Sequence, residues 1–341
     1  MPTSKLPTTI VDAHHHFLDT ANNDFQGFLG SLVPNESYLP SDYAKDVVAP
    51  LKDAGIAIVG SVHVECMPDD GPAEATWVQS MAADSTIQTI VASTDLTKES
   101  VNDDLNKLKE TSPQVHGIRW ILDCVGPFRK GQDATHVATL RHNGIDYLRG
   151  RDGEAMPDFE RGFAALAQHG LSFDLQCAPV QLPAAARLCG RHPAVKVCIN
   201  HLGKPRMLLG PDGPSNNDMV DMDNDELTVW RAGMKAMAEQ PQVYVKLSML
   251  GYAIPGWIRT PERVALMKGL CREVVELFGT GRCMIALNWW KDGACSDADG
   301  LSDVGPGPVE FVQYMSDFFD DYSEKDRNRL FVGTAREFYK F

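Results

Sequence analysis

The chain has 341 residues and a mass of 37.5 kDa, with 43% hydrophobic residues, 23% charged residues and a formal net charge of −14. This acidic balance, with a pI near 5.1, argues against a nucleic-acid binder, which needs Lys and Arg for phosphates, and against docking on anionic membranes. No apolar run reaches the ~18 residues that a membrane-spanning helix needs. The composition is that of a globular chain with one large domain or two smaller ones.

The N-terminus and the cysteines bear on the cellular compartment. Residues 1–6 carry one lysine and no long apolar stretch, so they do not resemble a secretory signal peptide. The eight cysteines form no C-x-x-C pair, and several lie inside apolar runs such as residues 197–199. We therefore expect reduced, mostly buried thiols, no cysteine-based zinc site and a cytoplasmic location.

Short apolar runs alternate with helical patterns along the chain. Candidate strands are residues 8–13, 57–65, 86–95, 115–122, 172–178, 196–202, 244–250 and 283–289. Apolar spacing predicts helices at 43–53, 74–83, 158–169, 182–188, 228–239 and 261–278. Eight such units predict a (β/α)8 TIM barrel made by residues 1–341 as a single domain. An open, doubly wound sheet is the alternative, but it would want a Gly-rich phosphate loop where residues 14–17 read His-His-His-Phe.

Two long segments interrupt this alternation. Residues 123–158 follow the fourth strand and carry a cluster of Arg, Lys and His side chains, whereas residues 203–227 follow the sixth strand and contain Gly-Pro-Asp-Gly-Pro. Because both segments follow strands, we expect both to lie over the C-terminal face of the barrel, the second as a lid. The basic cluster either draws in a small anionic substrate or forms a solvated loop surface.

Polar side chains fall on one face of several candidate strands. Successive strand residues alternate between two faces, so one face can pack under helices while the other points into the barrel. The inward polar set is Ser61, His63, Glu65, Arg119, Asp174, Gln176, Lys246 and Ser248. Burying so many polar groups is costly unless they pair with one another or with a ligand. We favour a ligand because they gather near one end of the strands; mutual pairing is the alternative.

Three histidines fall at the same end. His14 and His16 are two positions apart on the first strand, so they face the same way with roughly 6.6 Å of rise between them, whereas His15 points away. His201 ends the sixth strand, which glycine and proline stop. Imidazoles placed in this way can hold one divalent metal. Histidines with a purely structural role are the alternative.

Five segments, taken together, resemble a known family. They read IVDAHHHF from residue 10, GIRW from 117, HLGKP from 201, VKLS from 245 and GTAREFY from 333. This ordered set is similar to the amidohydrolase-related lactonases of the amidohydrolase superfamily, over nearly the whole chain. The resemblance implies a (β/α)8 barrel that hydrolyses a lactone or related carboxylic ester. It also implies that His14, His16 and His201 form the metal or substrate-carbonyl site and that Arg119 contacts a substrate carboxylate.

The chain departs from that family pattern at Asn288. The family ends its eighth strand with an aspartate that deprotonates water and then protonates the leaving group, and an amide cannot accept this proton near neutral pH. General-base catalysis is worth about 10²- to 10⁴-fold, so Asn288 implies either a replacement base or a lost activity. Asp292 is the first candidate for the replacement base, and Glu65 is the second. Alternatively, Asp292 is an exposed loop carboxylate with no catalytic role.

The remaining expectations concern the metal and the substrate. Three neutral histidines can hold zinc with water in the fourth place, or they can polarise a carbonyl without metal. Arg119 suits a carboxylate, with a structural ion pair to Asp174 or Glu65 as the alternative. Further candidates for substrate contacts are Gln176, His63, Tyr147 and Trp290.

The sequence therefore predicts a hydrolase that opens a small carboxylate-bearing lactone or ester by water attack on a carbonyl held by the histidines or by zinc. The expected partner is a small anionic substrate, not nucleic acid or a membrane. Two alternatives stay open: a non-oxidative decarboxylase of the same superfamily, and a non-catalytic binding protein that lost its base at Asn288. The substrate's identity and the oligomeric state are open, a homo-oligomer included.

Overall fold

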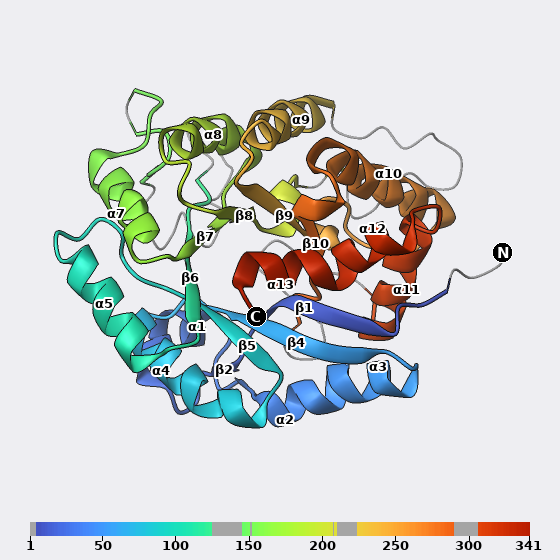
Figure 1. The fold of residues 1–341 in the computed structure, drawn as a ribbon, viewed down its shortest axis with the longest axis horizontal. Helices are drawn as coiled ribbons and strands as arrows, with labels where there is room; N and C mark the ends of the chain where they lie inside the picture. Colours follow the sequence, from blue (N-terminus) through green and yellow to red (C-terminus); the bar gives the residue numbers. More distant parts are fainter. Residues whose placement is uncertain (1–4, 125–144, 151, 207, 210–223, 290–305) are drawn as a thin grey trace.

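A computed structural model describes residues 5–124, 145–150, 152–206, 208, 209, 224–289 and 306–341. Eight parallel strands follow one another in chain order around a single sheet (Figure 1). They are β1 (Thr9–His15), β4 (Ala57–Val64), β5 (Ile87–Ala92), β6 (Val115–Ile121), β7 (Ser172–Gln176), β8 (Val197–Ile199), β9 (Val243–Leu247) and β10 (Cys283–Ile285). The chain after β10 returns to β1, because Asn288 N donates to His14 O (2.7 Å) and His16 N donates to Trp289 O (3.2 Å). The predicted TIM barrel is confirmed, and the open doubly wound sheet is wrong.

Helices surround the barrel (Figure 1). The helices are α1 (Gly27–Leu32), α2 (Pro40–Tyr43), α3 (Ala49–Asp53), α4 (Gly71–Met81), α5 (Val101–Thr111), α7 (Pro157–Gln168), α8 (Leu182–Arg191), α9 (Asn224–Ala238), α10 (Pro261–Phe278), α11 (Pro308–Phe318), α12 (Glu324–Asn328) and α13 (Thr334–Tyr339). Several begin with proline, whose fixed φ suits the first helical turn. Every predicted helix has a counterpart here. The helix α5 was not predicted, because its apolar stripe is only Val101, Leu105 and Leu108 within a polar stretch.

The outward faces of the strands form the core with the helices. Trp120 of β6 stacks on Phe159 of α7 with ring centroids 6.0 Å apart, and Phe173 of β7 meets Phe163 of the same helix at 5.4 Å. Burying an aromatic or aliphatic side chain of this size stabilises the fold by roughly 1.5–3 kcal/mol. This packing leaves the opposite strand faces, which carry Arg119 and Asp174, to line the barrel interior.

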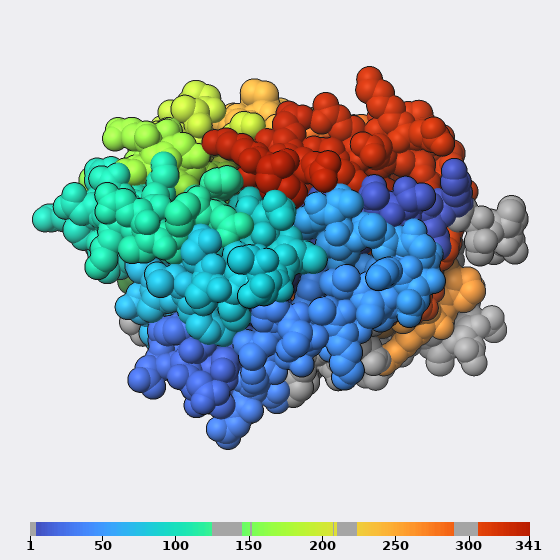
Figure 2. All heavy atoms as spheres, turned by 60° about the horizontal axis from the view of Figure 1, so that its bottom comes forward, coloured from blue at the N-terminus to red at the C-terminus, as the bar shows by residue number. Residues whose placement is uncertain are grey.

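The C-terminal helix covers the end of the barrel where the strands begin. Tyr339 O of α13 accepts hydrogen bonds from Thr89 Oγ1 (3.2 Å) and His116 Nδ1 (2.8 Å), which lie early in β5 and β6. In the space-filling view the red C-terminal segment lies directly against the blue and cyan N-terminal third (Figure 2). The opposite end of the barrel, where the strands stop, is therefore the end left to the predicted site.

Two loops predicted from the sequence lie only partly within the described residues. The predicted loop 123–158 is described only at 123–124, 145–150 and 152–156 before α7 begins, and the predicted lid 203–227 only at 203–206, 208–209 and from α9 onward. A short antiparallel pair, β2 (Leu18–Asp19) with β3 (Ser37–Tyr38), lies between β1 and β4 in the sequence.

Among the described helices, none combines the length and the apolar character that crossing a bilayer requires.

Candidate active site

The backbone turns sharply where several barrel strands stop. Residues 201–204, directly after β8, all have positive φ angles (54°, 57°, 73° and 52°). Met67 after β4, Met249 after β9 and Asn288 after β10 are also left-handed, with φ of 53°, 48° and 53°. Left-handed non-glycine residues cost of order 1–3 kcal/mol each and persist where the surroundings hold them, often at functional sites. The strained end of the barrel is the end where the predicted site residues lie.

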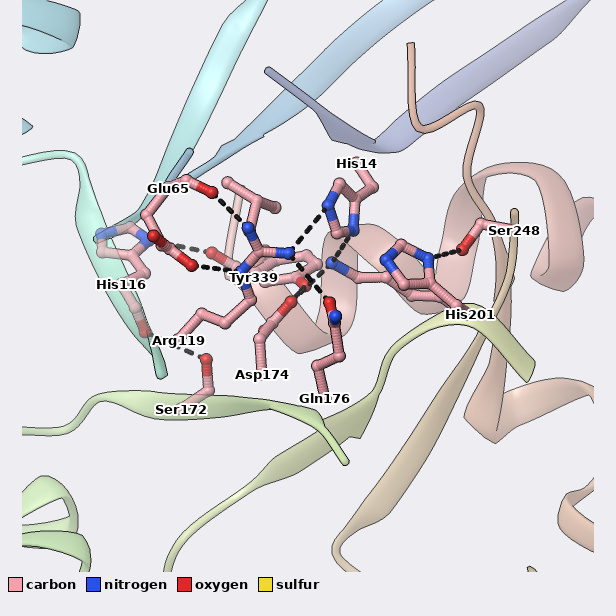
Figure 3. Close-up of polar contacts among 12 residues, drawn as sticks. His14, Glu65, His116, Arg119, Ser172, Asp174, Gln176, His201, Ser248 and Tyr339 are labelled. Carbon is pink, nitrogen blue, oxygen red and sulfur yellow. Dashed lines mark hydrogen bonds and ion pairs between the residues drawn. The ribbon is translucent and has the colours of Figure 1, made fainter. Parts of the chain in front are cut away.

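Three histidines meet at this end, as the sequence predicted. His14 lies on β1, His16 directly after it, and His201 in the left-handed turn after β8; all are buried. The Nε2 atoms of His14 and His16 are 3.2 Å apart, and the rings of His14 and His201 have centroids 4.9 Å apart. His14 and His201 lie side by side in the close-up (Figure 3). His14 and His201, which are 187 positions apart in sequence, thus share one site.

Hydrogen-bond partners fix the proton of His16 and place cations beside His14. His16 Nδ1 contacts the carbonyl of Val64 (2.8 Å), which only accepts, so Nδ1 is protonated and Nε2 holds a lone pair. His14 Nδ1 lies 3.4 Å from the Lys246 Nζ, which only donates in its ion pair with Asp174. Arg119 Nη1, which also only donates, points at His14 Nε2 from 3.5 Å, so cations face both ring nitrogens of His14.

The three imidazoles are neutral at neutral pH. Burial lowers the pKa of His14 well below its usual 6.5, and the charge of Lys246 adds to that effect. Burial followed by the charge of Arg119 does the same to the pKa of His16 and the pKa of His201. His201 Nδ1 lies 3.0 Å from Ser248 Oγ, which positions the ring (Figure 3). A neutral imidazole can donate one proton and accept another, as general acid–base chemistry requires.

Arg119 reaches from β6 toward His14 but is held mainly by Glu65. Its Nε donates to Glu65 Oε1 (2.6 Å), and its Nη2 donates to the backbone carbonyl of Glu65. The remaining nitrogen, Nη1, lies 3.5 Å from His14 Nε2 and 3.4 Å from Gln176 Oε1 (Figure 3). The ion-pair alternative with Glu65 is thus present, and Arg119 offers one donor to the site instead of a two-pronged grip on a carboxylate.

Glu65 has little capacity left to act as a base. Its Oε1 binds Arg119 and its Oε2 accepts from Met67 N (2.7 Å). Nearby Glu74 of α4 accepts from Cys66 N (2.9 Å), and burial, followed by the charge of Glu65, raises the pKa of Glu74 to about 8. Glu74 is therefore mainly protonated at neutral pH, and the charge of Arg119 is balanced by Glu65.

A second buried pair stands beside Gln176. Lys204 Nζ donates to Asp123 Oδ2 (2.7 Å), which also accepts from Gln176 Nε2 (2.9 Å). The Lys204 ammonium lies over the ring of Tyr252, 4.7 Å from its centroid. Gln176 thus links Arg119 to the Asp123–Lys204 pair, which closes one wall of the site.

Asn288 lies at the closure of the barrel. Its Nδ2 contacts Met249 Sδ (3.0 Å), and its buried Oδ1 has no hydrogen-bond partner within the part of the chain that the structure describes. The Asp12 carboxylate also links the two strands that close the barrel. It accepts hydrogen bonds from Leu287 N (2.8 Å), His14 N (3.1 Å) and Tyr43 Oη (2.7 Å). Burial raises the pKa of Asp12 to about 6 despite these bonds. Asp12 holds the backbone of the two strands that carry the site.

His14, His16 and His201 are the residues that would hold a divalent metal at this site. The 3.2 Å between His14 Nε2 and His16 Nε2 is close to the roughly 3.3 Å that separates two nitrogens on a tetrahedral zinc ion. However, the guanidinium of Arg119 points at that nitrogen of His14 from 3.5 Å, and the Lys246 ammonium lies 3.4 Å from the other ring nitrogen. Among the described residues there is no group of three or more His, Cys, Asp or Glu placed to hold a metal. The described side chains therefore do not fit the zinc ion that the sequence suggested.

Other predicted residues are placed elsewhere. His63 of β4 packs its ring on His15 and Phe17, both at 5.7 Å between centroids. Tyr147 stacks on Trp120 (4.8 Å), on the helix-facing side of β6. Asp292 and Trp290 lie outside the described residues, so the first candidate base stays a prediction.

Sequence reasoning missed the roles of three residues. Lys246 was placed on the inward face of its strand, but its contact with His14 was not foreseen. Asp12 has the same parity as His14 and His16, which was the available signal. Tyr339 reaches Asp174 from the C-terminal helix (2.9 Å to Oδ2), and no local pattern marks a contact 165 positions away.

Comparisons with known proteins agree with this fold. The family model described as Amidohydrolase matches residues 11–341. An L-fucono-1,5-lactonase of Burkholderia multivorans is 25% identical over 96% of this chain and 95% of its own length. An amidohydrolase from Burkholderia multivorans, crystallised with bound zinc, superposes with a TM-score of 0.68 at 21% identity, covering 98% of this chain and 99% of that one. A Pseudomonas putida protein provisionally named 2-pyrone-4,6-dicarboxylic acid hydrolase gives a TM-score of 0.65 at 16% identity, covering 98% of both chains. The structural likenesses concern the fold.

Proposed function

This chain belongs to the amidohydrolase family, and we propose that it opens a small lactone or carboxylic ester by direct attack of water on the acyl carbon. The observation that carries the proposal is the meeting of one cation with three neutral histidines at one point. Arg119 Nη1 points at His14 Nε2 from 3.5 Å at the strained end of the barrel, and the rings of His16 and His201 lie beside His14. A guanidinium at this point suits an oxygen atom that gains negative charge during reaction, and neutral imidazoles suit the transfer of the proton that water loses.

The remaining imidazoles supply the proton chemistry. Water attacks the carbonyl carbon and gives a proton to His201 Nε2, whose ring Ser248 positions through Nδ1. The oxyanion formed on the former carbonyl oxygen accepts a hydrogen bond from Arg119 Nη1, which in the free protein points at His14 and Gln176. The acyl C–O bond then breaks, and His201 returns the proton to the leaving oxygen, which leaves a hydroxy acid. In this scheme His201 replaces the base that Asn288 cannot provide, with Asp292 as the competing candidate.

The charges around the site favour an uncharged substrate. Each of three cations there is paired with a carboxylate: Arg119 with Glu65, Lys204 with Asp123 and Lys246 with Asp174. Of the expected basic cluster in the loop, the described Arg149 is paired with Asp146 (2.5 Å). These pairs leave no surplus positive charge from those groups for a carboxylate. We therefore rank uncharged aldonolactones, such as the substrate named in the Burkholderia relative, ahead of dicarboxylates.

A panel of substrates tests the proposal. Purified protein is mixed with aldono-1,4- and 1,5-lactones, a pyrone dicarboxylate, simple aryl esters and hydroxybenzoic acids, and acid release and CO2 release are followed separately. The proposal expects acid release from at least one lactone above the uncatalysed rate, with aldonolactones preferred. Acid release from no member of the panel would contradict it.

The same panel separates the two alternatives. Release of CO2 from a hydroxybenzoic acid, with no acid from lactones, would assign the decarboxylase function. Activity that appears only in Asn288→Asp, and not in the natural chain, would favour a binding protein that lost its base. The proposal expects Asn288→Asp to change the rate of an already active enzyme.

A further inference from the structure

The end of β8 carries a buried carboxamide that the reaction described above does not use. Asn200 lies between Ile199, the last residue of β8, and His201, and it is 1% exposed. Its side-chain oxygen and its side-chain nitrogen both lack a hydrogen-bond partner within the residues that the structure describes. Its backbone is extended (φ −80°, ψ 150°), and its N–H donates to the carbonyl of Leu175 (2.8 Å), so it continues the pairing of β8 with β7.

Alternation along β8 places this carboxamide on the inner face of the barrel. Cys198, two residues earlier, pairs with Asp174 of β7, whose carboxylate binds Lys246 inside the barrel. Asn200 therefore shares the inward face. The same pairing brings Asn200 beside Gln176, two residues after Asp174, and Gln176 faces the site in the close-up (Figure 3).

An ordinary structural role does not account for the two unpaired ends of Asn200. An asparagine before a helical turn commonly caps it by accepting a backbone N–H, but Asn200 makes no such side-chain bond to the turn that follows. Its neighbour Gln176 has both ends of its amide engaged: Nε2 donates to Asp123 (2.9 Å), and Oε1 accepts from Arg119 (3.4 Å). A polar group buried without a partner costs stability, so native proteins keep few of them. A bound molecule can supply the partner that the described residues do not.

We propose that Asn200 binds a hydroxyl group of the substrate, on the carbon next to the acyl carbon of an aldonolactone. This inference rests on the proposed function, because it names what the same site recognises. A carboxamide donates and accepts, as a hydroxyl group does, whereas a carboxylate only accepts and would set a negative charge against Oδ1. The neighbours of Asn200 are His201, which takes the proton, and Gln176, which contacts the guanidinium at the carbonyl. A group that Asn200 binds therefore lies within a bond or two of the acyl carbon.

The test compares two lactones that differ by this one hydroxyl, ribono-1,4-lactone and 2-deoxyribono-1,4-lactone, with each kcat/KM divided by the uncatalysed rate. The natural chain is expected to favour the hydroxylated lactone by about 10- to 100-fold, because the deoxy compound leaves the buried carboxamide unpaired. Asn200→Leu, which puts an apolar group of similar size in place of the amide, is expected to bring the two values within about threefold. Asn200→Ala, which adds no atoms, gives the same comparison if leucine does not fit.

Gln242→Met is the matched control. Gln242 Nε2 donates to the carbonyl of Cys189 (2.8 Å), and its buried Oε1 also lacks a partner among the described residues. It directly precedes β9, at the end of the barrel away from the site. This variant should keep the natural preference for the hydroxylated lactone.

Two kinetic outcomes would overturn the proposal: equal values for the two lactones in the natural chain, or an unchanged preference in the Asn200 variants. Thermal unfolding separates a structural role from recognition. The unfolding temperature of Asn200→Leu is expected to stay the same or to rise, because an unpaired buried amide is removed. A lower unfolding temperature with the preference intact would show that Asn200 serves the fold alone.

Binding experiments separate the failure of this inference from the failure of the proposed function. Ribono-1,4-lactam and 2-deoxyribono-1,4-lactam keep the shape of the lactones but resist opening. Their dissociation constants, measured by ligand-observed NMR, should differ by about tenfold in the natural chain and agree in Asn200→Leu. If this holds while no lactone is opened, hydrolysis fails and the role of Asn200 stands. Lactams that bind equally to the natural chain, or not at all, would overturn the inference even if lactones are opened.

Discussion

Two groups of histidines lie on opposite faces of the end of β1 and have different surroundings. His14 and His16 face Lys246 and Arg119, with nitrogen atoms 3.2–3.5 Å apart. His15 lies between them in sequence but faces Ser61, Tyr43 and His63, and its ring is 4.7 Å from that of Tyr43. Alternation of side chains on a strand separates the two groups. The comparison teaches that position on a strand, and not residue type, assigns a histidine to chemistry or to packing.

Burial affects both groups in the same direction, so pKa alone does not distinguish them. The pKa of His14 falls well below 6.5, and burial lowers the pKa of His63 to about 3. What separates them is the partner set: ammonium, guanidinium and imidazole groups around His14, against the aromatic rings of His15 and Phe17 around His63. Experiments that exchange one histidine at a time can therefore break or sharpen the comparison.

The largest expected effect is on catalysis. His14→Gln should lower kcat for lactone opening by about 10²- to 10³-fold, because the imidazole that Arg119 and His16 contact in the site is lost. His63→Leu, its matched control from the packing group, should stay within about twofold of the natural rate. Steady-state kinetics on the same lactone measure both variants. Equal losses in the two variants would erase the distinction between the groups.

The next effect concerns stability at the Arg119–Glu65 pair. Arg119→Met should lower the free energy of unfolding by about 3–5 kcal/mol, because it leaves the Glu65 carboxylate buried without its cation. Adding Glu65→Gln should restore much of that loss while activity stays low. Urea unfolding and lactone kinetics on the two variants separate the contributions. A double variant as unstable as Arg119→Met alone would show that the charge of Glu65 is not the cause.

A smaller effect is expected from the packing group in acid. His63 binds a proton near pH 6.5 when unfolded but only near pH 3 when folded, so its contribution to stability falls as pH drops from 6.5 toward 3. His63→Leu lacks this proton site and should lose less stability over that range, with a difference of about 2 kcal/mol at pH 5 relative to pH 8. Unfolding curves at the two pH values give the comparison. Parallel pH dependence of the two proteins would contradict the buried, neutral state of His63.

The smallest expected effect is that of chelation. Because two cations stand beside His14 and the described residues include no group of three ligands placed for a metal, prolonged treatment with a chelator should leave lactone opening within about twofold. Added zinc should not raise it. Rates before and after dialysis, with elemental analysis of the same samples, provide the measurement. Loss of activity on chelation with recovery on zinc addition would mean that the side chains rearrange around a metal.

Strand parity predicted a good part of this site from the sequence. The residues whose side chains point into the barrel as predicted are Arg119, Gln176, Lys246 and Ser248. Their strands are regular, so side chains alternate between the two faces without a break. The family resemblance brought His201 to the same end as His14, and the structure brings the two together.

Counting alternate positions along a strand was less useful where the strands are irregular or where the contacting residues are far apart in sequence. The register between β1 and β4 shifts on both sides of Asp12, and that between β4 and β5 shifts after Ser61, so counting along β4 did not place His63 in the packing group. Tyr339 fills the barrel from the far end of the chain, which only the tertiary fold determines. Tyr147 lies outside the barrel wall, where its ring packs on Trp120 of β6 and Phe159 of α7.

Hydrolysis of the preferred lactone in H2¹⁸O tests the central idea most directly, because it follows the attacking oxygen itself. The account predicts one ¹⁸O in the carboxylate of the product acid, none in the hydroxyl that leaves, and near-complete loss of this labelling rate in His14→Gln but not in His63→Leu. Label in the leaving hydroxyl, or an undiminished rate in His14→Gln, would contradict water attack at a carbonyl held by the His14 group.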